Sequence, residues 1–221
     1  KVGAACVRQD GFEADDIIAT ASKHCIEEKV HCLIVSNDKD LLQLVDDEGN
    51  VSALRYEKGG YSEYTAQQVI ESFEIRPDQI TDYLALLGDS SDNIPGVKGI
   101  GKKGAAELLR RFGTINDIYQ HIEELTPANR KKLEEGYASA QISKELVTLK
   151  QIDSFSCRQT GTPVVQLKWE QALSDFEKIG AKSLVQEVGG DSDKVIRYDA
   201  SGGSEESPNN LAESLGLQGT G

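Results

Sequence analysis

No stretch of this sequence is apolar over the roughly 18 residues that a membrane-spanning helix needs, and none has the pattern of a signal peptide. Its four cysteines have the spacing of neither a metal-ligand motif nor a disulfide framework. No nucleophilic Ser or Cys is paired with a base, and the three histidines are isolated. We therefore expect a cytoplasmic protein with reduced thiols, no membrane partner and no covalent enzyme intermediate.

The net charge of −13 at first argues against a nucleic-acid partner, but the charge is unevenly distributed. Between Gly96 and Phe112 five basic residues stand against one acid, whereas residues 187–221 carry seven acids against two bases. Contact with a DNA backbone requires a local basic patch and not a basic total. With 38% hydrophobic and 28% charged residues, the chain is expected to be a globular protein with one core and room for a small subdomain.

The first carboxylate motif, EADD, opens a helix expected over residues 13–29. Glu13 and Asp16 are three apart and share one face of this helix, while Asp15 points more to the side. Acids in a first turn also interact favourably with the helix dipole, by about 0.3–1 kcal/mol each. For this motif alone, that explanation is as good as metal binding.

The second carboxylate motif follows a buried strand expected over residues 31–35. Asp38 and Asp40 are two apart and point to the same side if the chain is still extended. The carboxyl end of a buried strand is the usual place for a site in an open α/β sheet. A helix-capping role for Asp38 is the alternative.

The third acidic pair, Asp89 and Asp92, precedes a glycine-rich hairpin, and a second helix begins near Gly101. Gly99 and Gly101 can take backbone angles that other residues avoid, and they let a ligand approach the main chain. The free amides of the second helix favour an anion, and nearby lysines suit a phosphodiester backbone. A helix–loop–helix turn with solvated lysines is the alternative for the glycine pattern alone. The residues expected to contact DNA are Lys98, Gly99, Gly101, Lys102, Lys103 and Gly104.

These motifs together resemble a known family. LLGDSSDNIPGVKGIGKKGAAELL is similar to the helix–hairpin–helix region of 5′-nucleases, in particular the 5′→3′ exonuclease domain of bacterial DNA polymerase I. GFEADDIIAT and SNDKDLLQLV match the other acidic motifs of that family, in the same order. The resemblance covers residues 2–188. It implies an α/β fold with a PIN-like, Rossmann-like sheet, incomplete at the N-terminus, followed by a helical helix–hairpin–helix subdomain.

The resemblance also implies a metal site. Crowded carboxylates raise each other's pKa unless cations are present, and hard oxygen ligands suit Mg²⁺ or Mn²⁺. Two such ions about 3.5–4 Å apart can activate a water and stabilise the leaving oxygen of a phosphodiester. In the family the hairpin also holds a monovalent cation, here K⁺ near residues 97–100. The expected metal ligands are Glu13, Asp15, Asp16, Asp38, Asp40, Asp89 and Asp92, of which Asp15, Asp16, Asp38 and Asp40 are the expected catalytic residues.

Two departures from the family bear on these expectations. The family usually has Thr where Gly104 stands and often Glu where Lys102 stands. Gly104 costs the helix about 1 kcal/mol relative to Ala and removes a hydroxyl, while Lys102 adds charge. The family also places further aspartates, a central strand and a basic helical arch upstream of this sequence. We therefore expect only part of the site and part of the sheet here.

The expected organisation is an α/β catalytic part (residues 1–80), a helix–hairpin–helix part (81–188) and a flexible acidic tail or linker (189–221), beyond which a polymerase domain could follow. The expected function is Mg²⁺-dependent 5′→3′ exonuclease and 5′-flap endonuclease activity on DNA, in replication and repair in a bacterial cytoplasm. A non-catalytic helix–hairpin–helix module that binds duplex DNA is the alternative. The other expected elements are strands at 51–56 and 164–167, a loop at 58–60, and helices at 41–44, 114–125, 127–149 and 169–179.

Overall fold

The computed structural model describes residues 6–58, 60–155 and 169–189. Its contacts divide the chain into two compact units, residues 11–155 and residues 1–10 together with 156–221. Every residue expected to act lies in the first unit. The strand expected at 164–167 and the tail expected beyond residue 189 lie outside the described residues, and the boundary expected at residue 80 stays a prediction.

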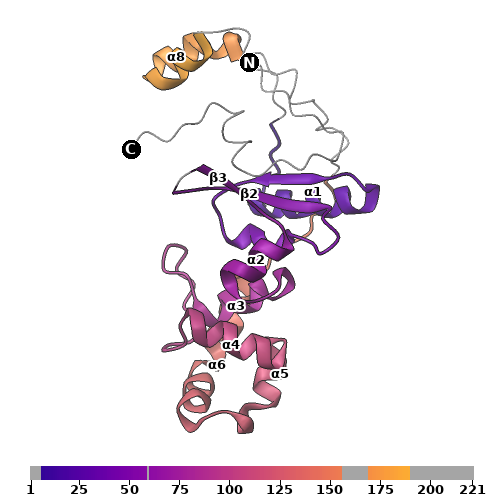
Figure 1. Ribbon diagram of the computed structural model, residues 1–221, viewed down its shortest axis with the longest axis vertical. Coiled ribbons are helices and arrows are strands. Elements are labelled where there is room, and N and C mark those ends of the chain that lie inside the picture. The colour runs from indigo at the N-terminus through magenta and orange to yellow at the C-terminus, as the bar shows by residue number, and fades with distance from the viewer. Residues whose placement is uncertain (1–5, 59, 156–168, 190–221) are drawn as a thin grey trace. The chain divides into compact units, whose positions relative to one another are not determined.

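The sheet of the first unit has three strands in the order β1-β2-β3 (Figure 1). β1 (Cys32–Val35) pairs in parallel with β2 (Val51–Glu57), and β2 pairs in antiparallel with β3 (Gly60–Tyr64). The first two strands confirm the sequence prediction. The prediction of a loop at 58–60 is wrong at its last residue, because Gly60 pairs with Glu57 and begins β3. β3, which the sequence did not predict, is short and largely polar. Its strand conformation therefore depends on pairing with β2 more than on the β propensity of its residues.

Three helical segments accompany the sheet along the chain, and the first two of them begin within the first two acidic motifs. α1 (Ala14–Glu28) packs on the sheet and ends where Lys29 adopts a left-handed conformation, so the helix expected at 13–29 is confirmed (Figure 1). The 3-10 helix η1 (Asp40–Leu44) confirms the short helix expected after the second motif and buries Leu41 and Leu42 in the core. α2 (Ala66–Phe73) follows β3.

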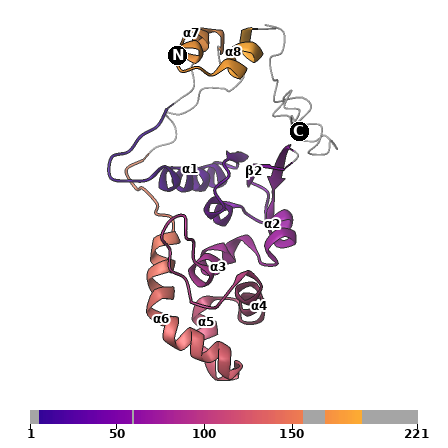
Figure 2. The same cartoon turned by 90° about the vertical axis from the view of Figure 1, so that its left-hand side faces the viewer.

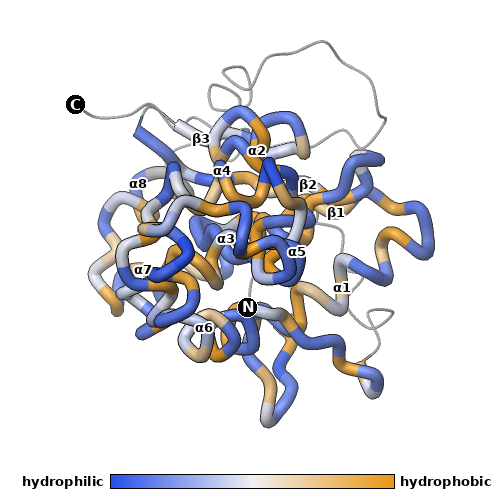
Figure 3. The backbone as a smooth tube through the Cα atoms, turned by 90° about the horizontal axis from the view of Figure 1, so that it is seen from below, coloured by the Kyte–Doolittle hydropathy of each residue, from blue (hydrophilic) through white to orange (hydrophobic). Residues whose placement is uncertain are grey.

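The remaining helices of this unit are η2 (Pro77–Gln79), α3 (Ile80–Leu87), α4 (Lys102–Phe112), α5 (Ile115–Gln120), η3 (Ile122–Glu124) and α6 (Pro127–Val147). They confirm the expected helices at 114–125 and 127–149. α6 runs alongside α3 (Figure 2). Hydrophobic and hydrophilic residues alternate along α4 (Figure 3), so one face packs inward and the other stays exposed.

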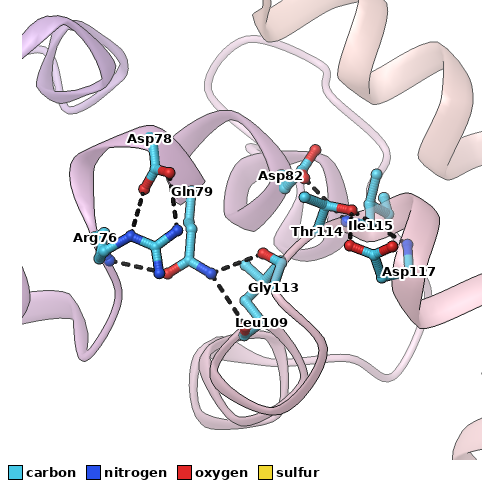
Figure 4. Close-up of polar contacts among 9 residues, drawn as sticks. All are labelled: Arg76, Asp78, Gln79, Asp82, Leu109, Gly113, Thr114, Ile115 and Asp117. Carbon is cyan, nitrogen blue, oxygen red and sulfur yellow. Dashed lines mark hydrogen bonds and ion pairs between the residues drawn. The ribbon is translucent and has the colours of Figure 1, made fainter.

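Buried polar side chains lock the α3–α4–α5 junction (Figure 4). Gln79 Nε2 donates to the carbonyl oxygens of Leu109 (3.0 Å) and Gly113 (2.7 Å), which close the C-terminal end of α4. Asp82 Oδ2 accepts a hydrogen bond from the Ile115 amide (2.9 Å) at the start of α5. These bonds satisfy helix-end groups that burial would otherwise leave unpaired. The orientation of α4 is therefore fixed at its far end, away from the hairpin.

The second unit contains, within its described residues, η6 (Trp169–Ala172), α7 (Leu173–Lys178) and α8 (Lys182–Gly189). The first two confirm the helix expected at 169–179, whereas α8 was not predicted. Across the described ranges, no helix combines the length and the apolar character needed to cross a membrane.

Candidate metal centre and nucleic-acid interface

The EADD motif divides its carboxylates between two tasks. Asp16 is engaged by backbone amides: Oδ2 accepts from Glu13 (3.4 Å) and Oδ1 accepts from Lys150 (2.8 Å). Half-buried Asp15 instead faces other acids. Burial raises the pKa of Asp15, and the charge of Asp38 raises this pKa further. Asp16 therefore caps the start of α1, a role that was not predicted beside the helix dipole, while Asp15 lies among like charges.

The second motif forms a tight turn. Asp38 Oδ1 accepts from the Asp40 amide (2.9 Å), but η1 begins after Lys39 and no side chain caps it, so this bond closes the turn and is not the helix cap weighed as the alternative for Asp38. Burial and then the charge of Asp38 raise the pKa of Asp40 to about 6, although Lys39 acts in the opposite direction. Within the described residues, Asp40 Oδ1 is buried without a hydrogen-bond partner. An unpartnered buried carboxylate oxygen is unfavourable and fits a cation as its missing partner.

The third acidic pair is also divided. Asp89 forms an ion pair with Lys39, its Oδ1 accepts from the Ser91 amide (2.8 Å), and its side chain is only 8% exposed. Asp92 lies on the exposed part of the same loop. Its charge contributes to raising the pKa values of both Asp15 and Asp40. Asp92 thus joins the other acids, whereas Lys39 already neutralises Asp89.

We call Asp15, Asp38, Asp40 and Asp92 the carboxylate cluster. Their mutual repulsion and the unpartnered oxygen of Asp40 fit a hard divalent cation. In the part of the chain that the structure describes, no three acids, histidines or cysteines already converge as a metal cage. The four acids are therefore near enough to affect one another's charge, but they are not as close together as the ligands of a bound metal ion. Glu13 and Asp16 border it, and Asp89 is held beside it by Lys39.

The hairpin after the cluster is held together by close backbone packing. A Cβ on Gly96, which has φ +61°, would lie 2.4 Å from the Gly88 nitrogen. The Val97 amide donates to the Leu86 carbonyl (2.8 Å). Gly99 has φ +86°, as the sequence predicted. Gly101 differs from the expectation, because its φ of −99° is open to any residue. A Cβ at Gly101 would meet no atom within 4 Å, so packing does not require a glycine there, and close approach of a ligand stays a prediction.

The start of α4 offers free amides and unpaired lysines. Gly101 precedes the helix and no side chain caps it. Lys98, Lys102 and Lys103 are exposed, and none of them forms an ion pair with another described residue. Such a combination attracts an anion. Arg110 and Arg111 contribute less than their sequence positions suggested, because they pair with Glu74 (2.6 Å) and Glu124 (3.0 Å).

Two functional candidates escaped the sequence prediction. Lys132 on α6 donates to the Gly99 carbonyl (3.1 Å), beside the position at which the hairpin was expected to hold K⁺. Its separation of 33 residues from Gly99 left no local signal. For Lys39 the sequence did contain a local signal, because a lysine between two aspartates of a metal motif must pair with an acid or point away from the metal. In the structure Lys39 forms an ion pair with Asp89.

Comparison with known proteins agrees with this geometry. Residues 1–74 match the model of the 5′–3′ exonuclease N-terminal resolvase-like domain, and residues 75–165 match that of the 5′–3′ exonuclease C-terminal SAM fold. The chain is 44% identical to DNA polymerase I of Treponema pallidum over 67% of its own length and 15% of that protein. It is 44% identical to a 5′–3′ exonuclease of Halalkalibacterium halodurans over 71% of its own length. It spans about half of that relative, 54%.

Solved structures show the same fold. T5 5′-exonuclease, in a structure with bound divalent zinc ions, is 29% identical and superposes with a TM-score of 0.52 over 62% of this chain and 50% of that one. The T5 D15 protein co-crystallised with metal ions gives 27% identity and a TM-score of 0.54 over 64% and 51%. The PIN-like α/β fold is thus confirmed. With both of its domain models matched in order, the chain belongs to the 5′–3′ exonuclease family.

Proposed function

We propose that this chain serves metal-dependent hydrolysis of DNA phosphodiesters, as a 5′→3′ exonuclease and 5′-flap endonuclease in replication and repair. The observation that carries the proposal is the carboxylate cluster, in which Asp40 has a raised pKa and a buried oxygen without a partner among the described residues. A group of acids that destabilise one another is costly for a folded protein unless a ligand relieves the repulsion. The metal-bound T5 relatives make a divalent cation the natural candidate.

In this proposal the cations are Mg²⁺ or Mn²⁺, two in number. Asp15, Asp38, Asp40 and Asp92 would hold them, with Glu13 and Asp16 acting at the edge of the site. When bound, such ions lower the pKa of a coordinated water and stabilise the charge that develops on a phosphodiester. Asp89 would contribute only after Lys39 moves away, because that lysine pairs with it in this structure.

The hairpin would hold the duplex without reading its sequence. The exposed amides at the start of α4 and the ammonium groups of Lys98, Lys102 and Lys103 suit phosphate oxygens. Gly99, Gly101 and Gly104 would let the sugar-phosphate strand approach the main chain closely. A K⁺ ion at the carbonyl groups of residues 97–100 would compete with the ammonium group of Lys132 for the Gly99 carbonyl, because two cations at one oxygen repel each other.

Residues 1–80 would then provide the catalytic acids and residues 81–188 the DNA contacts. Because the relatives in T. pallidum and other bacteria are DNA polymerase I, we also propose a bacterial cytoplasmic protein near the nucleoid, with a covalently linked polymerase as partner. This chain spans 15% and 19% of two such relatives.

One observation favours a non-catalytic duplex-binding module instead. Asp16 and Asp89 have backbone or lysine partners, so part of the acidic set already has a structural role. In a binding module all of the acids would be structural, and no cation would be needed. Divalent-cation dependence of cleavage separates the two functions.

The test is cleavage of a 5′-flap duplex by the full-length protein with and without Mg²⁺, in the wild type and in Asp38→Ala. We expect cutting to require Mg²⁺ and to fall by about 10²–10³-fold in the variant, while duplex binding in EDTA stays the same. Asp47→Ala, which removes an exposed acid outside the cluster, is the matched control. Equal cleavage by the wild type and Asp38→Ala would refute the nuclease assignment.

A further inference from the structure

Gln43 joins three elements at the back of the carboxylate cluster. Its Nε2 donates to the carbonyl oxygens of Asp40 (2.8 Å) and Val147 (3.0 Å). Its Oε1 accepts from Thr81 Oγ1 (3.1 Å). One side chain therefore connects the turn that carries the second acidic motif with the end of α6 and the start of α3. Two carbonyl acceptors and one hydroxyl donor match a primary amide and no other side chain of this length.

α6 contacts the hairpin through one face, along residues 132–143, and the last of these contacts lies one turn before Val147. Buried Ser143 accepts from the Gly96 amide (2.9 Å), and Lys132 donates to the Gly99 carbonyl (3.1 Å). Between them, Gly136 packs so closely on the hairpin that a Cβ there would lie 2.7 Å from Val97 Cγ1. α6 is one continuous helix from Pro127 to Val147 (Figure 2).

The chain just beyond α6 is tied to the first acidic motif. The Lys150 amide donates to Asp16 Oδ1 (2.8 Å), and the Ile152 amide donates to Thr20 Oγ1 (3.0 Å). Lys144 also forms an ion pair with buried Asp82 of α3 (2.8 Å). α6 therefore contacts the hairpin along residues 132–143, and its last residue and the chain just after it contact the first two acidic motifs.

We propose that Gln43 is a positioning residue that couples the carboxylate cluster to the hairpin through α6. It holds the Asp40 backbone at a fixed distance from the helix that supports the hairpin. A cation bound at the cluster and a duplex bound at the hairpin then favour the same arrangement, so each strengthens the binding of the other. This proposal rests on the proposed function, because it requires a cation site at the cluster.

The experiment measures that coupling without cleavage. Duplex affinity of the full-length protein for a 5′-flap DNA is measured in EDTA and in Ca²⁺, a hard cation that seeks oxygen ligands. The ratio of the two dissociation constants is the coupling factor. Binding of Ca²⁺ to the protein alone is measured by calorimetry. The variants are Gln43→Met, which keeps the length and loses the amide, and Ser143→Ala, which removes the acceptor of the Gly96 amide. Gln67→Met, at an exposed position of α2, is the control.

In the wild type and Gln67→Met we expect a coupling factor of about 5–150. Gln43→Met should weaken Ca²⁺ binding by about 10–100-fold and bring the factor close to 1, while duplex affinity in EDTA stays within about twofold. Ser143→Ala should leave Ca²⁺ affinity unchanged and also lower the factor. A merely structural glutamine would lower the melting temperature and leave the factor intact.

The outcomes separate the two proposals. If Gln43→Met keeps the wild-type coupling factor and Ca²⁺ affinity, the positioning role is refuted and the nuclease assignment stands. If the wild type binds no cation and shows no coupling, the proposed function fails, and the role of Gln43 fails with it. Loss of coupling in Gln43→Met with a melting temperature equal to that of the control would support the positioning role most directly.

Discussion

The carboxylate cluster and the hairpin are close in sequence but differ in how well their groups are satisfied. The core of the hairpin is complete: the amides of Gly96, Val97 and Ile100 have partners, Val97 and Ile100 are buried, and Gly96 fits against backbone atoms. The cluster is incomplete, because burial and then the charges of neighbouring acids raise the pKa values of Asp15 and Asp40, and Asp40 keeps a buried oxygen without a partner among the described residues.

The difference separates two ways of preparing a binding surface. The hairpin is preorganised, so a phosphate backbone meets groups that need not move. The cluster stores electrostatic repulsion, which a divalent cation can convert into binding free energy. Lys39 shows the same principle within the chain, since its ammonium already neutralises Asp89 at the edge of the cluster.

The largest expected effect tests the completeness of the hairpin. Gly96→Ala should lower the free energy of unfolding by about 2–5 kcal/mol, because the residue has φ +61° and its Cβ would lie 2.4 Å from a backbone nitrogen. Gly101→Ala is the matched control and should cost less than about 1 kcal/mol, because nothing lies within 4 Å. Chemical denaturation measures both. Equal losses would mean that the hairpin is not closely packed at Gly96.

The next effect tests whether the hairpin binds phosphate. Replacing Lys102 and Lys103 by Glu should weaken duplex binding by at least about tenfold and make its salt dependence shallower by about two phosphate contacts. Titration of duplex DNA at several salt concentrations gives the slope. Glu107→Lys, an exposed change further along α4, serves as the control for charge alone. An unchanged slope would remove these lysines from the DNA-binding surface.

A smaller effect tests the repulsion in the cluster. The folded-state pKa of Asp40 is about 6, above the usual 3.8, so the folded protein binds the extra proton more tightly than the unfolded chain does. The stability contribution of Asp40 is therefore present below pH 4 and is lost as pH rises through about 6. Without divalent cations, Asp40→Asn should melt about 2–4 °C above the wild type at pH 7.5, after allowance for partial exposure, and at about the same temperature at pH 4.

That comparison needs a reference acid, and Asp47→Asn, at an exposed position outside the cluster, provides one. It should match the wild type at both pH values. If Asp40→Asn is less stable than the wild type at pH 7.5, the cluster is not under repulsion, and the contrast with the hairpin disappears.

The smallest effect concerns the two arginines of α4. Arg110→Gln and Arg111→Gln should each change duplex affinity by less than about twofold and leave the salt slope unchanged, because the side chains pair with Glu74 and Glu124. The same salt titration measures this. A slope that falls as far as it does for the Lys102 and Lys103 variant would extend the DNA-binding surface to the end of α4.

Much of this arrangement was predictable from local patterns. Apolar periodicity and capping signals gave α1, α4 and α6, and the apolar runs gave β1 and β2. The predictions failed where local pattern is weak or shared by two roles. β3 has little apolar alternation, and Gly101 has an ordinary backbone conformation although a glycine pattern suggested otherwise. Asp16 accepts a capping bond and Asp38 a turn bond, and a short acidic motif does not tell such local roles from metal binding.

By itself, the sequence determined which residues could bind a cation or a phosphate, and in what order along the chain. Only the tertiary structure decided which of these groups pair with other residues and which stay available for a ligand. It brought Asp92 near the two earlier acidic motifs and paired Lys39 with Asp89. It also brought Gln43 to the C-terminal end of α6, the helix whose N-terminal half carries Lys132. The physical reason is range: helix caps and glycine turns depend on neighbours in the chain, whereas repulsion, ion pairs and carbonyl contacts depend on distance in space.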